Sequence, residues 1–468
     1  MKDIERILKH FKDISNIPRG SGNEAEVSKF IEAFGKNLGL ETKRDEVNNV
    51  IIIKPATPGY ENSKTVVVQG HMDMVCEKTL NSNHDFLKDP IANIKEGDFI
   101  HADETTLGAD NGIAVATAMA LLEDNTVAHP KLECLFTVEE ETTMKGANHL
   151  KESDLEGRII LNIDSEEEGE LTCSSAGGKL YMGHFEREFM PAGDEKAYKI
   201  SLKGLLGGHS GVQIQKNKGN AVKLLAEVLK DMSGYRIADF KSGTKNNAIP
   251  RSGEVIVLSS DDDFESKVKD AFEKVKEAHK EVEGEIVFDL EGASPAPAMS
   301  EDDSKDFVNY LLELHTGLYS VMKEGFTETS SNLAIVEKTS KGFDVHNLQR
   351  SASHEKMDEL DKKIKDTSDK YKVKFEYTGE YPAWEYNENS KLKNLAMKLY
   401  KDITGEDMLV RITHGGLECG VFSNTFPGVD IISYGPNIFG AHTPKEKFQI
   451  SSVERVYDYT KELLKNLK

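Results

Sequence analysis

Two side chains with metal-binding chemistry follow a continuous apolar stretch near the start of the chain. The tract 66–68 is Val-Val-Val, and two residues later it reaches His71 and then Asp73. Because side chains at i and i+2 of an extended backbone leave on the same side, both are expected beyond the carboxyl end of one strand. A neutral imidazole binds zinc or cobalt, and a neighbouring carboxylate orients the ring. For this pair alone, a capped turn with a hydrogen-bonded histidine is the alternative.

Three further stretches also end in carboxylates. Each has an ordinary explanation by itself, because an aspartate before a helix is a common N-cap and an acidic run is usually solvated. In a mostly parallel sheet, however, all these positions would lie at one edge. The acids are Asp110 within the glycine-bounded turn 107–112, Glu139 to Glu141 after the apolar tract 132–138, and Asp164 at the end of the apolar tract 158–163.

A second histidine follows the last predicted strand. After the stretch 429–433 and a short loop, the chain reaches Gly440-Ala441-His442. Two histidines with three or four carboxylates are too many ligands for one catalytic zinc, which takes three protein groups. They suit two ions that share a carboxylate and activate a water near neutral pH. A carboxylate that is not a ligand is then needed as general base, and Glu139 or Glu140 can supply it.

Five tracts together carry a family resemblance. They are His71-Met72-Asp73, Gly108-Ala109-Asp110-Asn111-Gly112, Glu139-Glu140, Asn162-Ile163-Asp164 and Gly440-Ala441-His442. In type and order they resemble the motifs of the co-catalytic dizinc exopeptidases of the aminoacylase and carboxypeptidase G type. Within that family, the tracts 69–78 and 414–420 are similar to the bacterial aminoacyl-histidine dipeptidases, also called cytosolic non-specific dipeptidases.

The resemblance implies a metal content and a role for each motif residue. It implies two divalent ions, zinc first, with cobalt or manganese as alternatives. It also implies a cis peptide bond after the bridging aspartate. The implied roles are Asp110 as the ligand of both ions, His71 and Asp164 on one ion, Glu140 and His442 on the other, Glu139 as the general base, and Asp73 as the clamp of the His71 ring.

Size and composition set the domain count and exclude some partners. At 468 residues the chain exceeds a single core. The net charge of −22 argues against nucleic acid or an anionic membrane as a partner. Four widely spaced cysteines indicate free thiols. No apolar stretch reaches about 18 residues and the amino-terminal segment has no signal core, so a cytoplasmic protein is expected.

The predicted fold is α/β, with a mostly parallel central sheet covered by helices on both faces, as in zinc exopeptidases. Residues 1–185 and 383–468 are expected to form the catalytic domain, and residues 186–382 an inserted α+β lid. In the insert, strands and charged helices alternate as β-α-β-β-α-β and the pattern then repeats. This alternation predicts two ferredoxin-like halves.

Candidate substrate contacts lie in the insert and near the carboxyl terminus. The resemblance implies an oxyanion role for a histidine in the glycine-rich tract 206–211. Arginines of the insert could hold a substrate carboxylate bidentately, and a carboxylate beside Gly415-Gly416 could bind an ammonium group. For each of them a surface or structural role is the alternative. These candidates are His209, Asn247, Arg251, Arg350 and Glu418.

These features predict a zinc metallopeptidase that hydrolyses unblocked dipeptides, Xaa-His among them. An N-acyl-amino-acid deacylase or a tripeptide aminopeptidase of the same fold is the first alternative. A non-catalytic binding scaffold is a more remote one. The expected partner is a small peptide substrate, and a homodimer is left open.

Overall fold

The computed structural model describes residues 2–323 and 325–468. The chain forms two compact units. Unit 1 comprises the residues up to Ser175 together with Trp384–Thr413 and Leu417–Lys468, and unit 2 comprises Ala176–Ala383 and His414–Gly416. The first boundary therefore lies at 175 rather than at the expected 185. The reason is strand β9 (Gly177–Glu186), which pairs along its length with two strands of unit 2.

In the described residues, unit 1 contains an eight-stranded sheet of order β1-β2-β6-β3-β7-β21-β8-β20. Its centre, β6-β3-β7-β21, is parallel, and the edge β1-β2-β6 is antiparallel. The expected α/β class is confirmed. The sheet is mixed, with parallel strands at its centre as expected and antiparallel strands added at the β1-β2 edge. The strands are β1 (Glu41–Arg44), β2 (Val50–Lys54), β3 (Val66–His71), β6 (Leu132–Thr137), β7 (Ile159–Asn162), β8 (Glu170–Ser175), β20 (Leu409–Thr413) and β21 (Asp430–Ser433).

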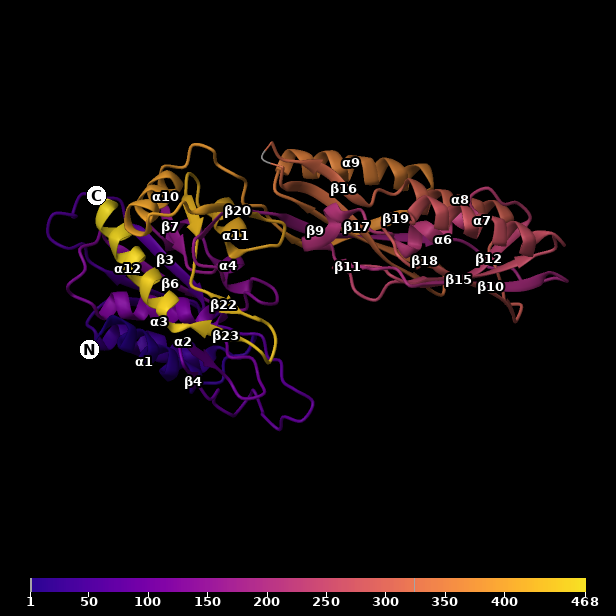
Figure 1. The fold of residues 1–468 in the computed structure, drawn as a ribbon. Coiled ribbons are helices and arrows are strands. Elements are labelled where there is room, and N and C mark those ends of the chain that lie inside the picture. The colour runs from indigo at the N-terminus through magenta and orange to yellow at the C-terminus, as the bar shows by residue number, and fades with distance from the viewer. Residues whose placement is uncertain (1, 324) are drawn as a thin grey trace. The chain divides into compact units, whose positions relative to one another are not determined.

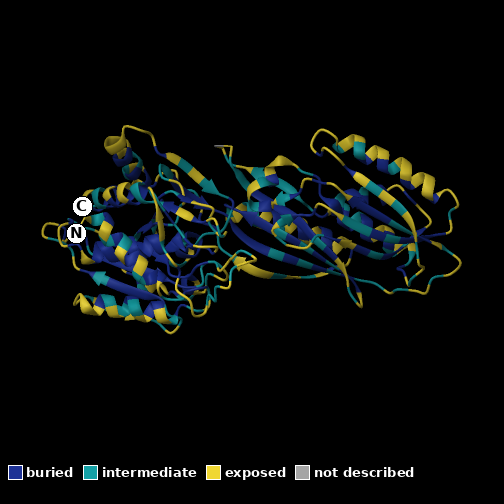
Figure 2. Ribbon diagram, turned by 60° about the horizontal axis from the view of Figure 1, so that its bottom comes forward, coloured by how far each residue is buried: buried dark blue, intermediate teal, exposed yellow. Residues whose placement is uncertain are grey.

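Helices cover both faces of this sheet because successive strand residues point to opposite sides. Val66 and Val68 of β3 pack in a core with α1, α3 and α12, whereas Val67 packs in another core with α4 and α11. Figures 1 and 2 show these layers around the buried strands. The helices are α1 (Asp3–Ser15), α2 (Ala25–Asn37), α3 (Ala109–Glu123), α4 (Lys145–His149), α10 (Lys391–Thr404), α11 (Glu418–Thr425) and α12 (Ile450–Asn466).

A small antiparallel sheet of unit 1 contains the strands on either side of the loop 440–446, which follows β21. Strand β23 (Lys447–Gln449) pairs with β22 (Ile438–Phe439) and with β5 (Phe99–His101), which pairs with β4 (Ile94–Glu96). The segment 440–446 is thereby held between two paired strands.

Unit 2 contains one long antiparallel sheet, and its strand order explains the repeated pattern of the sequence. The order is β15-β10-β14-β12-β17-β18-β9-β19. In the first half, β10, β12, β14 and β15 are strands 1 to 4 of a ferredoxin-like unit, whose spatial order is 4-1-3-2. In the second half, β9, β17, β18 and β19 are strands 1 to 4 of a second unit with the same order. The halves join where β12 pairs with β17. The strands are β10 (Lys196–Lys203), β12 (Tyr235–Ser242), β14 (Gly253–Ser259), β15 (Val287–Ala293), β17 (Thr327–Lys338), β18 (Gly342–Ser351) and β19 (Lys374–Tyr381), with β16 (Gly317–Val321) beside β17.

Four helices of unit 2 share one core with this sheet. They are α6 (Ala221–Leu229), α7 (Phe264–His279), α8 (Glu301–Glu313) and α9 (His354–Lys370). A two-stranded ribbon of β11 (Gly208–His209) and β13 (Ala248–Ile249) lies apart from the long sheet and precedes the short helix α5 (Ser210–Gln213). All four cysteines of the chain are free thiols, as expected. No helix in the described ranges has both the length and the apolarity that crossing a membrane would need.

Candidate metal centre

The carboxyl ends of the central strands of unit 1 carry a cluster of histidines and acids. His71 is the last residue of β3 and lies in register with Thr137, the last residue of β6. Asp164 comes two residues after the end of β7 at Asn162. Because these strands are parallel, their ends meet at one edge of the sheet, as the sequence predicts.

Asp110 joins the two histidines. Its Oδ1 lies 3.2 Å from Nε2 of His71, and its Oδ2 lies 3.1 Å from Nε2 of His442. Each oxygen of one carboxylate therefore faces a different imidazole. This is the arrangement that a carboxylate bridging two cations requires. Thus residues more than 300 positions apart in the sequence converge on one aspartate.

Three more carboxylates lie close to His71 and His442. Asp164 Oδ1 lies 3.5 Å and Glu140 Oε2 4.0 Å from Nε2 of His71. Glu141 Oε1 lies 3.0 Å from Nε2 of His442. One ligand atom from each of His71, Asp110 and Glu141 falls within a sphere that a single cation could occupy, all within 4.8 Å of one another.

The electrostatics of the cluster fit bound cations. Burial and the nearby charge of Asp110 raise the pKa of Asp164 to about 6, despite the opposing effect of His71. Burial, with Asp164 and Glu141 nearby, raises the pKa of Glu140 well above its ordinary value. For His71, burial opposes the charged ring, but Asp164 and Asp110 still raise its pKa well above its usual range. Buried carboxylates thus exceed the positive charge available, and the nitrogen and oxygen donor set suits divalent metals such as zinc.

Asp73 contacts both the His71 ring and the acidic turn. Its Oδ1 lies 3.2 Å from Nδ1 of His71, and its carboxylate accepts hydrogen bonds from Ser21 Oγ and from the backbone N–H groups of Glu140 and Glu141 at 2.8, 3.1 and 3.2 Å. Although burial opposes its charge, the neighbouring His71 ring lowers the pKa of Asp73 overall. One carboxylate therefore fixes both the imidazole ring and the acidic turn.

In the acidic turn 139–141, the contacts with the two histidines are made by Glu140 and Glu141, one residue later than the expected Glu139 and Glu140. Glu139 lies at positive φ (53°), and its carboxylate accepts from Lys145 Nζ at 2.7 Å and Thr143 Oγ1 at 3.1 Å. The carboxylate that meets His442 is that of Glu141, where Glu140 was expected. Glu140 takes the place facing His71. The expected placement of Glu139 in the cluster is wrong, and Glu141 was missed because three identical letters leave the register of the turn undetermined.

The turn that carries Asp110 departs from helical geometry. Asp110 and Asn111 have non-helical φ/ψ within α3, and the peptide bond between them is cis, as the resemblance implied. The Asn111 side chain accepts from the backbone N–H of His71 at 3.2 Å and donates to the carbonyl of Ile163 at 2.7 Å. It thereby connects the turn to the strand ends that present His71 and Asp164.

Three of the expected substrate contacts lie together in unit 2. His209, Asn247 and Arg251 line one cavity of about 990 Å³ beside the ribbon of β11 and β13. Arg350 does not line this cavity, but its charge acts on His209: burial lowers the pKa of His209, and Arg350 lowers it further. The Arg350 side chain donates from Nη1 to Tyr381 Oη at 2.8 Å and to the carbonyl of His414 at 3.3 Å, and its Nε is buried without a hydrogen-bond partner.

Glu418 does not have the access that binding of a substrate ammonium group would need. Its side chain is fully buried in unit 1, and its Oε2 accepts from Gln69 Nε2 at 2.6 Å and Thr137 Oγ1 at 2.8 Å. Burial raises the pKa of Glu418 to about 8, which disfavours the charged form that would pair with an ammonium group. The expected role of Glu418 is therefore wrong, because the sequence cannot show that its helix packs over the sheet interior.

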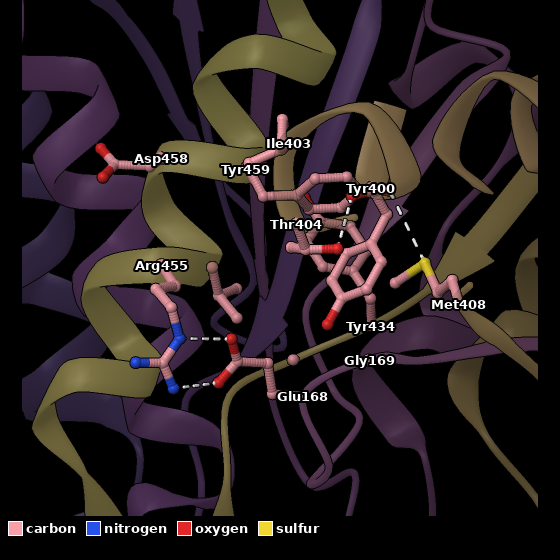
Figure 3. Close-up of a pocket in the computed structure, with 12 residues that line it drawn as sticks. Glu168, Gly169, Tyr400, Ile403, Thr404, Met408, Tyr434, Arg455, Asp458 and Tyr459 are labelled. Carbon is pink, nitrogen blue, oxygen red and sulfur yellow. Dashed lines mark hydrogen bonds and ion pairs between the residues drawn. The ribbon is translucent and has the colours of Figure 1, made fainter. Parts of the chain in front are cut away.

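Unit 1 has a cavity of about 120 Å³ whose lining differs from the metal cluster (Figure 3). Half of its lining residues are aromatic or apolar, among them Tyr400, Met408 and Tyr459. Glu168 and Arg455, which also line it, form a bidentate ion pair in which Nε and Nη2 of the arginine each lie 2.6 Å from a carboxylate oxygen. Its described lining residues bring no histidine to a carboxylate, so the candidate centre is the cluster at the sheet edge.

The sheet with helices on both faces, together with the histidine–carboxylate cluster at its carboxyl edge, defines a metallopeptidase of the zinc-exopeptidase fold. Comparison with known families agrees. Residues 67–466 match Peptidase family M20/M25/M40, and the chain belongs to that family.

Two relatives match nearly the whole chain. The cytosol non-specific dipeptidase of Escherichia coli (strain K12) is 38% identical over 468 residues, with 98% of this chain and 96% of the relative covered. The crystal structure of aminoacylhistidine dipeptidase from Vibrio alginolyticus superposes with a TM-score of 0.91 at 34% identity, with 98% and 96% of the two chains covered. Aminopeptidase PepT from Bacillus cereus ATCC 10987 shares the fold, with a TM-score of 0.58 at 16% identity over 99% and 98% of the chains.

Proposed function

We propose that this chain is a cytoplasmic dipeptidase that hydrolyses unblocked dipeptides, Xaa-His among them, with two divalent metal ions. The observation that carries the proposal is Asp110, whose two oxygens face His71 and His442 at 3.2 and 3.1 Å. The names of the two relatives that match nearly the whole chain, a cytosol non-specific dipeptidase and an aminoacylhistidine dipeptidase, support the substrate class and, for the first, the compartment.

Each residue of the cluster then has a role. Asp110 would hold both ions, His71 and Asp164 would complete one, and His442 and Glu141 the other. Zinc is the ion we expect, with cobalt and manganese as alternatives. When bound, the ions would polarise the peptide carbonyl and lower the pKa of a bound water to about 7.

Glu140 is the general base in this assignment. Its carboxylate faces His71, and its backbone N–H is fixed by Asp73 at 3.1 Å. It accepts a proton from the attacking water and delivers that proton to the departing amine. Glu140 thus takes the role that the sequence analysis gave to Glu139, because the carboxylate of Glu139 is bound by Lys145.

Residues of unit 2 supply the remaining substrate contacts in this proposal. His209, Asn247 and Arg251 share a cavity of their unit, which supports a common task in binding. The free Nε of Arg350 is a buried donor that a substrate carboxylate could satisfy. A requirement for both free termini would explain a preference for dipeptides.

Substrate and metal tests decide between this proposal and its alternatives. We expect elemental analysis of the purified protein to find about two divalent ions per chain, and unblocked dipeptides to be cleaved faster than tripeptides or N-acyl amino acids. Faster cleavage of acylated substrates would identify a deacylase, and faster cleavage of tripeptides an aminopeptidase. A protein without metal and without chelator-sensitive hydrolysis would be a scaffold.

A further inference from the structure

We propose that Arg19 and Glu446 are positioning residues that hold the Asp110 turn in the orientation that metal binding requires. This inference rests on the proposed two-metal function. It concerns two buried, oppositely charged side chains that the cluster itself does not include.

Glu446 ties the Asp110 turn to the loop of His442. It lies four residues beyond His442 and is 2% exposed. Its Oε2 accepts from the backbone N–H groups of Leu107 at 2.7 Å and Gly108 at 2.9 Å, and its Oε1 from that of Asp110 at 3.1 Å. A single carboxylate therefore sets the distance between the two segments that supply Asp110 and His442.

Arg19 ties the same turn to the loop of His71. It is also 2% exposed, and it donates from Nη2 to the carbonyl of Gly108 and from Nη1 to the carbonyls of Met72 and Asp73, at 2.5, 2.8 and 3.2 Å. The ion pairs among residues 2–323 and 325–468 do not include Arg19. Its guanidinium binds backbone carbonyls directly, while the carboxylates of Glu446 and Asp73 act on its charge from nearby. Its planar fork therefore connects two loops.

The glycines of the turn support this reading of Arg19. Gly108 has a φ of +70°, and a Cβ there would lie 2.6 Å from Arg19 Nη2. A Cβ at Gly112 would lie 2.5 Å from the same nitrogen. Both ends of the tract 108–112 therefore need glycine because the guanidinium occupies the adjoining space.

Overall stability by itself does not explain why Arg19 and Glu446 are charged. Buried charges are costly to desolvate, and apolar residues of similar volume often replace them without loss of stability. What the pair provides is geometry: three N–H groups and one carbonyl of a four-residue turn are fixed from two neighbouring loops. Groups that orient metal ligands in this way typically change metal affinity 10–100-fold when they are mutated.

The experiment compares Glu446→Gln with Glu133→Gln. Glu133 is a matched control because it is also buried, and it also accepts from backbone N–H groups, those of Glu156 and Gly157 at 3.2 and 2.9 Å. It lies in register with Val67, four residues before His71, so it is about 13 Å from the carboxyl edge of the sheet. Metal affinity is measured by competition with a chromogenic zinc chelator, and the thermal unfolding of the metal-free proteins is measured in parallel.

We expect Glu446→Gln to bind zinc about 10–100-fold more weakly, with Glu133→Gln within about twofold of wild type. Unchanged affinity in Glu446→Gln, or an equal loss in both variants, would overturn the inference. If Glu446→Gln does not fold, Arg19→Lys, which keeps the charge but loses the planar fork, is judged against Glu133→Gln by the same criteria. A wild-type protein that binds none of zinc, cobalt and manganese would instead refute the proposed function, so the two failures are distinguishable.

Discussion

Neutralising Glu139 and neutralising Glu140 should have very different consequences, although the residues are neighbours of the same type. Glu140→Gln keeps the shape of a side chain that faces His71 but removes its ability to accept a proton. Loss of a general base typically costs 10²–10⁴-fold in rate. We therefore expect kcat to fall by at least about 100-fold in Glu140→Gln, with little change in KM.

The expected effect of Glu139→Gln follows from its surroundings. Its carboxylate is bound to Lys145, whose side chain is 53% exposed, and to Thr143. A pair that is open to solvent on one side contributes about 0–1 kcal/mol to stability. We expect a small loss of stability in Glu139→Gln and a kcat within about threefold of wild type, since no proton transfer depends on it.

Steady-state kinetics on an unblocked dipeptide, with metal content measured on the same samples, provide the assay. Equal metal occupancy in both variants separates loss of the base from loss of a ligand. The assignment is refuted if Glu139→Gln loses more activity than Glu140→Gln, because the acidic turn would then have the register that the sequence suggested.

Three further outcomes are expected. Chelation should abolish activity and lower the unfolding temperature, and zinc at 100 times its Kd should restore about 2.7 kcal/mol of stability; an unchanged melting curve would contradict this. Burial lowers the pKa of Lys223, which donates to the carbonyls of Leu312 and Leu314, to about 8. The unfolded chain then binds more protons than the folded one from about pH 8 to 10.5, so stability lost as pH falls through this window should amount to about 3 kcal/mol. Denaturant titrations should show this slope reduced in Lys223→Met, and a slope equal to wild type would refute it. Gly108→Ala should destabilise the metal-free protein by about 1–3 kcal/mol, because its Cβ would meet Arg19 at positive φ; a neutral effect in chemical denaturation would show that the turn can relax.

Much of the candidate centre could be predicted because it obeys a local rule. His71, Asp110, Asp164 and His442 each follow an apolar stretch or a glycine-bounded turn, and parallel strands bring such ends to one edge. The acidic turn escaped this rule. Glu139 adopts positive φ, which rotates the following residues so that Glu141 meets His442. Nothing in three consecutive glutamates distinguishes that register from its neighbour.

The repeated pattern of unit 2 was also visible in the sequence, but its first strand was not assigned to it. The alternation of strands and helices predicts two ferredoxin-like halves, and the sheet order has both. Strand β9 belongs to the second half although it precedes the whole first half in the chain. Pairing partners that distant are set by tertiary contacts, since a lone strand pattern does not specify which edge it joins.

The amino-acid sequence by itself determined the type of sheet, the residues that end its strands and, through them, a site with metal chemistry. These are consequences of periodicity and of backbone geometry, which act over a few residues. Only the tertiary structure decided which of three glutamates faces His442, that Glu418 is an interior group, and that Arg19 and Glu446 grip the Asp110 turn. These outcomes depend on burial and on contacts between segments far apart in the chain, and no local pattern encodes them.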